Sequence, residues 1–400
     1  MVSTLVKACL SILLLGLTAW LLPWSFDEET VRRIPVDMPA KSPEDLRAFP
    51  KAGYFFGHRA FLEGRTDTAA RYFEQVVSQN VLHIDAWLRR AETAISRDEQ
   101  PLARRISTML TQITKDVPRW KWDQALLARE LGQDEILTAN INILVSEGRQ
   151  ANDALWLMET HLKQDIGAVI EQLLPENREP YLRWLMRWRR TEDAVRVWHA
   201  LDADRHKDET LRLAFIHFLA GSGDLSLARE LWLPSADPAG ITNPGFEEPI
   251  TRMAFDWRFS DRKDEWSIRR TSQRVRSGLK ALEIRFFGSA NSNFHHLYQL
   301  VPVSPGGTYR LSYWWKALQI SSDKGVFVEI LGKDCHGLSE KGPMILGSQD
   351  WRHVSLDFQV PEDCRVAVIR FRRQKSVRFD NKLNGVLWLD DFVLQPLEKL

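Results

Sequence analysis

The segment Thr308–Ala317, TYRLSYWWKA, places three aromatic side chains and a lysine next to one another. Neighbouring residues of a strand point to opposite faces, so this segment splits into two sets. One set is apolar and is predicted to be core: Tyr309, Leu311, Tyr313 and Trp315. The other set is polar except for one indole: Arg310, Ser312, Trp314 and Lys316. The indole of Trp314 offers a flat ring for stacking beside hydrogen-bonding groups, and it needs a partner.

The sequence contains no recognisable catalytic constellation. A P-loop, a G-x-S-x-G elbow and an H-E-x-x-H zinc motif are all absent. His295 and His296 are adjacent, so in a strand they face opposite ways and cannot bind one metal together. Asp390 and Asp391 diverge in the same way, although a glycosidase needs two positioned carboxylates. We therefore expect a protein that is not an enzyme.

The bulk composition is that of a multidomain globular protein. A chain of 400 residues, 44% hydrophobic and 27% charged, is long enough for roughly two or three domains. Its formal net charge is +1, which argues against nucleic acid as a partner. Trp is abundant, with 16 residues, and is most useful in cores, interfaces and stacking sites.

The N-terminal segment, residues 1–27, is predicted to be a membrane anchor. Lys7 is followed by the apolar run ACLSILLLGLTAWLLPWSF, which is about the length of a minimal spanning helix. Trp20 and Trp24 near its far end are typical of a membrane interface. A cleaved signal peptide has a similar pattern and is the alternative. We expect a single-pass protein of the bacterial inner membrane with its bulk in the periplasm, or a secreted protein if the segment is cleaved.

Residues 42–236 are predicted to be helical, and three pairs of identical residues lie 34 positions apart: Ala69 with Ala103, Ala194 with Ala228, and Trp198 with Trp232. This period resembles the tetratricopeptide repeat, a helix–turn–helix unit that stacks into a solenoid with a concave groove. The resemblance is clearest at GYFFGHRAFLEGRTDTAARYFEQVVSQN (53–80) and at 181–233. It implies a groove that docks a protein partner, with a spacer role as the alternative.

The basic aromatic run YLRWLMRWRR (181–190) is the candidate docking face of the helical region. Trp184 and Trp188 are four residues apart and so lie on one face of a helix, beside Arg187. The alternative is that this stripe belongs to the helical core.

Residues 241–397 are predicted to form an antiparallel β-sandwich. Pro, Gly, Asp and Asn cluster near Asp237, and segments such as ALEIRFF, VFVEIL and RVAVIRF then alternate with period two. The ordered set NPGFE, SGLKALEI, LYQLVPVSPGGTYRLSYWWKA, WRHVSLDFQVP, VIRFRR and GVLWLDDFVL resembles jelly-roll carbohydrate-binding modules of families four, nine and twenty-two, which have a galactose-binding-like fold. The predicted fold class is therefore multidomain α + β: a membrane helix, a helical solenoid and a jelly roll.

The resemblance implies one structural calcium. In that family an acidic residue of the GFE segment and an Asp near the C-terminal DD commonly help to hold the ion, and they match Glu247 and Asp390 or Asp391. Strand alternation places Asp390 in phase with Phe392, so its carboxylate is expected to point inward and to need a partner. A salt bridge or a capped turn is the alternative.

The resemblance also implies a glycan site along one sheet. Sugar rings stack their apolar C–H faces on aromatic rings, while their hydroxyls bind planar polar side chains. If the strand register is right, one face is shared by Trp314, Arg310, Glu329, Arg370 and Arg372. The basic members would suit an anionic polysaccharide. The alternative is that Trp314 is covered by a loop or by the helical domain.

Cys335 and Cys364 are the candidate disulfide. In an oxidising compartment they would pair and close a loop of about 30 residues. Two isolated buried thiols are the alternative, because the sequence does not give their distance.

These predictions combine into a non-enzymatic scaffold or accessory protein in the synthesis, assembly or export of an extracellular polysaccharide. The helical domain would dock a protein partner, and the jelly roll would contact a polysaccharide or oligosaccharide. This combined role rests on analogy between folds. The alternatives are a pure protein–protein scaffold whose β domain binds no sugar, and a cryptic glycan-processing enzyme.

Overall fold

The computed structural model describes residues 42–46, 49–115, 117–233, 240–333, 335–379 and 381–397. The predicted membrane segment, residues 1–27, lies outside them. Of the helices within these ranges, none is both long enough and apolar enough to cross a bilayer. The chain divides into two compact units. One contains the helices up to Trp184 together with Arg196–Ala200, and the other contains Leu185–Val195 and the chain from Leu201 onward.

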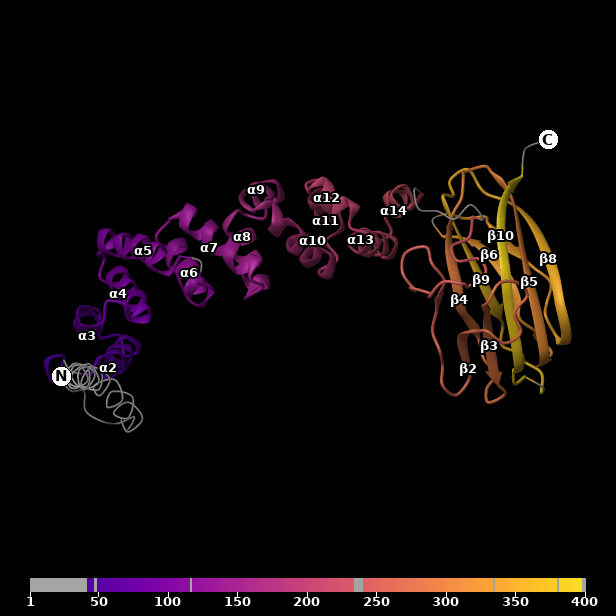
Figure 1. The fold of residues 1–400 in the computed structure, drawn as a ribbon, viewed down its shortest axis with the longest axis horizontal. Helices are drawn as coiled ribbons and strands as arrows, with labels where there is room; N and C mark the ends of the chain where they lie inside the picture. Colours follow the sequence, from indigo (N-terminus) through magenta and orange to yellow (C-terminus); the bar gives the residue numbers. More distant parts are fainter. Residues whose placement is uncertain are drawn as a thin grey trace, which may run out of the picture. The chain divides into compact units, whose positions relative to one another are not determined.

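The N-terminal half of the chain is helical, as its apolar spacing predicts (Figure 1). Its α-helices are α2 (Pro50–Leu62), α3 (Thr66–Gln79), α4 (Ile84–Ser96), α5 (Gln100–Thr114), α6 (Lys121–Glu130), α7 (Asp134–Ser146), α8 (Ala151–His161), α9 (Ile166–Gln172), α10 (Arg178–Arg187), α11 (Thr191–His199), α12 (Ala203–Lys207), α13 (Glu209–Ser222) and α14 (Leu225–Trp232). Short 3₁₀ turns lie at Glu44–Leu46, Pro118–Trp120 and Pro175–Asn177.

Small residues let the first helices cross closely. A Cβ added to Gly57 of α2 would lie 2.9 Å from Cβ of Tyr72 in α3, and one added to Gly53 would lie 2.9 Å from Val76. Ala60 and Ala69 are fully buried where the two helices meet. The sequence pattern of small and aromatic residues therefore acts by setting the distance between α2 and α3.

The C-terminal part is a sandwich of two antiparallel sheets (Figure 1). The strands are β1 (Arg258–Phe259), β2 (Trp266–Thr271), β3 (Ala281–Phe287), β4 (Phe294–Pro302), β5 (Thr308–Ser321), β6 (Phe327–Gly332), β7 (Ser339–Lys341), β8 (Gly347–Gln359), β9 (Val366–Arg373) and β10 (Asn384–Leu397). One sheet has the order β2-β3-β10-β5-β8 and is called the β5 sheet below. The other has the order β1-β4-β9-β6-β7 and is called the β9 sheet.

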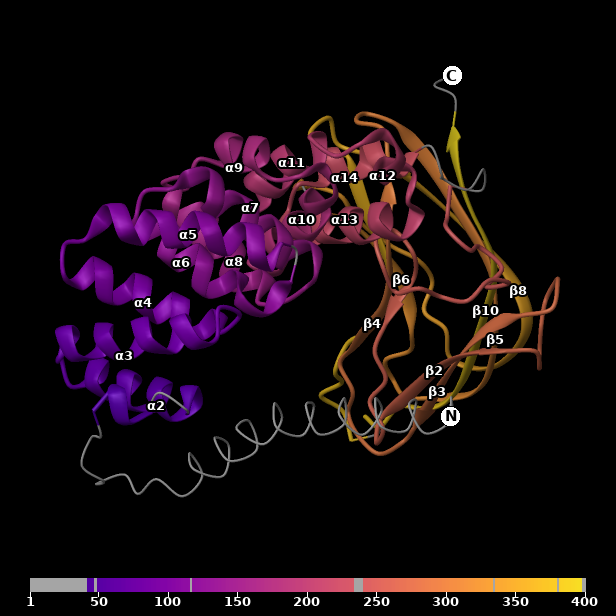
Figure 2. The same ribbon diagram turned by 60° about the vertical axis from the view of Figure 1, so that its left-hand side comes forward.

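The sandwich core lies between these two layers, with β4 and β6 on one side and β5, β8 and β10 on the other (Figure 2). Its centre is aromatic. The Tyr313 ring stacks on Phe392 with centroids 5.2 Å apart and meets Phe371 edge-on at 5.7 Å. Alternation along each strand supplies these rings, because every second residue faces the opposite sheet.

Cys335 and Cys364 are joined by a disulfide, with Cα atoms 4.9 Å apart. Cys335 lies in the loop between β6 and β7, and Cys364 lies between β8 and β9. The bond therefore ties two loops at the same end of the sandwich.

Candidate functional site

Strand β5 has the two faces that its sequence predicts. Tyr309, Leu311, Tyr313 and Trp315 are buried in the core. The side chains between them face outward and are partly or fully exposed: Arg310, Ser312, Trp314 and Lys316. The alternation predicted for this strand is therefore confirmed.

The five residues predicted to share one glycan-binding face do not share it. Arg310 and Trp314 lie on β5, whereas Glu329 lies on β6 and Arg370 and Arg372 lie on β9. These strands belong to different sheets, so the two groups point outward on opposite sides of the sandwich. The prediction was wrong because strand alternation separates inward from outward but does not say which sheet a strand joins.

One face of the Trp314 ring is covered, although the residue as a whole stays partly exposed. The guanidinium carbon of Arg276, in the loop between β2 and β3, lies 4.2 Å from the ring centroid. The ring of His353 on β8 lies 5.2 Å away. Stacking of a guanidinium on an indole is favourable, so Arg276 occupies the surface that a sugar ring would need. The alternative left open by the sequence, a covering loop, is the arrangement observed.

The cations beside Trp314 are also paired. Arg310 Nε and Nη2 donate to the two carboxylate oxygens of Asp357 at 2.6 and 2.7 Å. Lys316 Nζ lies 2.5 Å from Asp350 Oδ1. Both cations that flank Trp314 on β5 are therefore paired with carboxylates of the neighbouring strand β8.

Three carboxylates hold the loop that carries Arg276, and they are the predicted calcium ligands Glu247, Asp390 and Asp391. Asp390 Oδ2 accepts two backbone N–H groups at 2.9 and 3.4 Å, and Glu247 Oε1 accepts two at 2.9 and 3.1 Å. Gly278 has a φ of +61°, and any Cβ there would collide with Glu247. The donors are the N–H groups of Arg276 and Ser277 to Asp390, those of Leu279 and Lys280 to Glu247, and the Ser277 hydroxyl to Asp391.

Alternation predicted that Asp390 points into the core, and this prediction was wrong. Asp390 lies opposite Trp314 on the outer face of β10, and the loop above it leaves it 0% exposed. The phase of β10 changes between Asp390 and Val393, where Asp391 has a φ of +50°. A bulge of this kind shifts every later side chain to the other face, which the sequence pattern does not reveal.

The protein itself already engages these three carboxylates. Among the described residues no group of three or more His, Cys, Asp or Glu side chains is placed to hold a metal. Backbone N–H groups donate to both oxygens of Asp390 and to Oε1 of Glu247, atoms that a hard cation would otherwise bind. The three carboxylates act as a clasp on the loop. The calcium stays a prediction, and a Tm unaffected by EDTA would count against it.

The clasp predicts a specific pH dependence. Burial raises the pKa of Asp390 from 3.8 to about 6, despite the N–H groups that favour its charged form. Between pH 3.8 and about pH 6 the Asp390 carboxyl is protonated more often in the folded protein than in the unfolded chain. The stability that it contributes is therefore greatest at low pH and is lost as the pH rises through about 6. We expect a gain of about 1 kcal/mol from pH 7 to pH 5.

This dependence is measured by comparing Tm against pH in the wild type and in Asp390→Asn. The wild-type curve should rise relative to that of the variant as the pH falls. Parallel curves would contradict the assignment. The comparison is needed because burial also lowers the pKa of His217 and His296, which act in the opposite direction.

The outer face of the β9 sheet gathers polar side chains from three neighbouring strands. Tyr298 of β4 lies opposite Arg370 of β9, which lies opposite Glu329 of β6. Arg370 Nε donates to Glu329 Oε2 at 2.7 Å, and its Nη2 lies 2.6 Å from the same oxygen. The Glu329 side chain is 7% exposed. One row of this face therefore runs from a phenol ring to a guanidinium whose orientation a buried carboxylate fixes.

Arg372 and His295 extend this surface. Arg372 lies two residues along β9 from Arg370, and its Nη1 is 3.2 Å from His295 Nδ1. Tyr298 and His295 were missed as candidates for this site. The sequence signal for Tyr298 was alternation, because in a strand it points to the opposite face from the apolar Leu297.

The predicted docking stripe is divided between core and surface. Trp184 is 8% exposed and its ring stacks on Tyr181, with centroids 6.0 Å apart. Trp188, just beyond the end of α10, is 65% exposed, and Arg187 is exposed. The three residues therefore do not form one exposed face, because Trp184 packs in the helical core.

Solved structures resemble the β region, although no family model and no curated protein matches the chain. A family 61 carbohydrate-binding module in complex with β-1,4-galactotriose is 21% identical, with a TM-score of 0.28, and the match covers 40% of this chain and 98% of that one. A CBM22 xylan-binding domain from Paenibacillus barcinonensis is 15% identical, with a TM-score of 0.29, over 39% and 94%. Tailspike protein 4 of bacteriophage CBA120 is 14% identical, with a TM-score of 0.30, over 40% of this chain and 21% of that one. Likenesses of this size do not say what this chain binds.

Proposed function

We propose that the sandwich binds a glycan on the outer face of the β9 sheet and that the protein is a non-enzymatic scaffold for an extracellular polysaccharide. The helical half, with its tetratricopeptide-like period, would dock a protein partner of the synthesis, assembly or export machinery. The N-terminal apolar segment would hold the chain at the bacterial inner membrane, with the bulk in the periplasm. The row of Tyr298, Arg370 and Glu329 is the observation that carries the proposal.

The chemistry of this row suits a sugar. A phenol ring stacks on the C–H face of a pyranose, and its partly exposed position on β4 leaves a surface for that contact. Glu329 fixes the guanidinium of Arg370 through one carboxylate oxygen, so its remaining donors have set directions. Arg372 adds a second cation on the same face, which favours a glycan with carboxylates over a neutral one.

The test compares Tyr298→Ala with Trp314→Ala in the full chain. Affinity electrophoresis is run with alginate as the acidic polymer and a neutral β-glucan. We expect Tyr298→Ala to weaken alginate binding about tenfold, as loss of one aromatic contact should, and Trp314→Ala to leave it nearly unchanged. Trp314 is the matched control because it lies on the other sheet beneath Arg276.

Three results would contradict the proposal. Binding lost only in Trp314→Ala would move the site to the β5 sheet. Depolymerisation of the glycan by the purified chain would show an enzyme. Absence of binding to either polymer would favour the second candidate, a pure protein scaffold. One observation favours that candidate: ion pairs within the sandwich already satisfy charged groups on both outer faces, at Arg310 with Asp357 and at Arg370 with Glu329.

A further inference from the structure

The loop between β9 and β10 holds two apolar side chains fully in solvent. Val377 and Phe379 reach 102% and 104% of their reference exposure. Cations alternate with them in the sequence KSVRFDNK, which contains Lys375, Arg378 and Lys382 against one carboxylate, Asp380. Water-exposed apolar side chains on one loop cost hydrophobic free energy, so their position calls for a partner.

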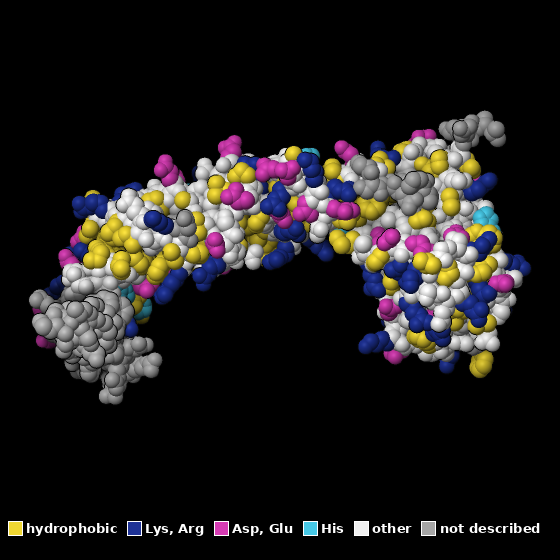
Figure 3. Space-filling view, viewed as in Figure 1, with side chains coloured by type: hydrophobic (Ala, Val, Ile, Leu, Met, Phe, Trp, Pro, Cys, Tyr) yellow, Lys and Arg dark blue, Asp and Glu magenta, His cyan; other side chains and the backbone are white. Residues whose placement is uncertain are grey.

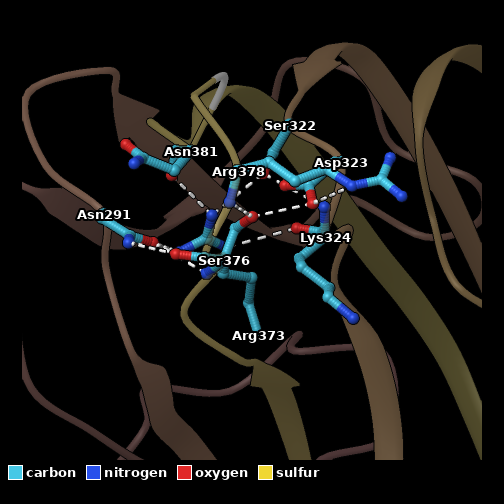
Figure 4. A network of polar contacts seen from close by, with 8 residues as sticks. All are labelled: Asn291, Ser322, Asp323, Lys324, Arg373, Ser376, Arg378 and Asn381. Carbon is cyan, nitrogen blue, oxygen red and sulfur yellow. Dashed lines mark hydrogen bonds and ion pairs between the residues drawn. The ribbon is translucent and has the colours of Figure 1, made fainter.

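The base of this loop is fixed. Arg373, the last residue of β9, is 0% exposed, and Ser376 Oγ donates to Asp323 Oδ2 at 2.7 Å (Figure 4). The Arg373 guanidinium donates to five acceptors: Lys324 O, Asn291 Oδ1, Ser292 O, Ser322 Oγ and Asn381 O. These acceptors come from three different loops. The network thus anchors both sides of the segment that carries Val377 and Phe379, and it holds their side chains away from the sandwich.

Further exposed apolar side chains lie at the same end of the sandwich. The ends of β3, β5, β8 and β10 meet here through strand pairing. Asn384 pairs with Phe287 and with Ser321, and Ile320 pairs with Gly347. The loop-end surface consists of the apolar residues Phe287, Leu318, Met344, Leu346, Val377 and Phe379 and the exposed cations Lys324, Lys375, Arg378 and Lys382. Lys and Arg side chains surround hydrophobic ones on the lower part of the sandwich in Figure 3.

We propose that the loop-end surface docks on an anionic lipid membrane. Val377 and Phe379 would enter the headgroup layer, while the cations beside them would meet lipid phosphates. A membrane fits better than a protein pocket because the apolar side chains protrude from a loop tip between positive charges. The carboxylate of Asp323 beside this loop accepts the Ser376 hydroxyl and lies 3.8 Å from Arg378 Nε. The proposal does not depend on glycan binding.

The test places an environment-sensitive dye on the full chain. Val377→Cys and, as a matched control, Leu279→Cys are labelled in a Cys9→Ser background. Leu279 is 75% exposed and lies in the clasped loop before β3, whereas the loop-end surface lies beyond the other end of that strand. With vesicles of phosphatidylcholine and phosphatidylglycerol, we expect a blue shift and quenching by brominated lipid at position 377 but not at 279.

Comparing the dyes at positions 377 and 279 separates this docking from membrane binding by any other part of the chain, because both labelled proteins share the same N-terminal segment. Replacing Lys375 and Lys382 with Gln should lower the response at position 377 by about fivefold per charge. Vesicles of phosphatidylcholine alone should give a weaker response. The proposal is overturned if the dye at 377 stays in water as at 279, or if both dyes respond equally.

Discussion

Replacing Arg373 with Met lowers the free energy of unfolding by about 3–5 kcal/mol. The buried guanidinium donates to all five of its acceptors, among them the carbonyl oxygens of Ser292 and Asn381 at 2.6 Å. Met fills a similar volume but donates nothing. The buried carbonyl of Ser292 then loses its donor away from water, which costs about 1–3 kcal/mol. The other four acceptors belong to partly or fully exposed residues, so water replaces the lost donors in part and each contributes less.

Denaturant unfolding of the variant measures this loss, and Arg372→Met is the matched control. Arg372 is the neighbouring residue, yet it faces outward and only its Nη1 approaches His295. We expect its replacement to change stability by less than about 0.5 kcal/mol. Arg373→Lys, which keeps a charge and fewer donors, should fall between the two. Equal stability of the Arg372 and Arg373 variants would show that the network is not a stabilising element.

The inward position of Arg373 could have been predicted from the sequence. It follows Ile369 and Phe371 at a spacing of two, and both are buried. A cation in phase with the core at the end of a strand suggests either exposure beyond the sheet or a buried network. The hydrogen-bond acceptors around the guanidinium decide between these two outcomes. They include Asn291 and Ser322, which are far from Arg373 in the sequence. Local periodicity does not contain such pairings.

The same limit explains the error at the glycan site. Alternation identified the outward residues of β5 and β9 correctly, because it depends only on neighbours in the chain. Membership of a sheet depends on which strands pair, and β5 pairs with β8 and β10 while β9 pairs with β4 and β6. Of the three predicted residues on β6 and β9, Glu329 and Arg370 form an ion pair, and Arg372 lies two residues along β9 on the same face. They lack Trp314 and gain Tyr298, whose strand lies next to β9.

The reversal at Asp390 has a different cause. The sequence shows two adjacent Asp residues in a strand and predicts that one of them points inward. The left-handed backbone at Asp391 breaks the alternation at this point, so Asp390 and Phe392 do not share a face. Asp390 is buried all the same, because the loop carrying Arg276 closes over it. The burial was predictable, but the element that buries it was not.

Removing the disulfide should destabilise the sandwich by about 3.5 kcal/mol, a loss comparable to that from Arg373→Met. Cys335 and Cys364 are 29 residues apart, and the bond between them restricts a loop of this size in the unfolded chain. Cys364 is also fully buried. The loss should therefore appear mainly as easier unfolding, while the two sheets keep their arrangement.

The measurement compares unfolding of the wild type, with and without dithiothreitol, to that of a double variant, Cys335→Ala with Cys364→Ala. Reduced wild type and the double variant should unfold at similar denaturant concentrations, both below the oxidised protein, and the double variant should not respond to the reductant. Because such a bond persists in an oxidising compartment, the same comparison bears on the proposed periplasmic location. If reduction leaves the stability of the oxidised protein unchanged, the disulfide does not stabilise the sandwich. It then gives no support to the proposed periplasmic location either.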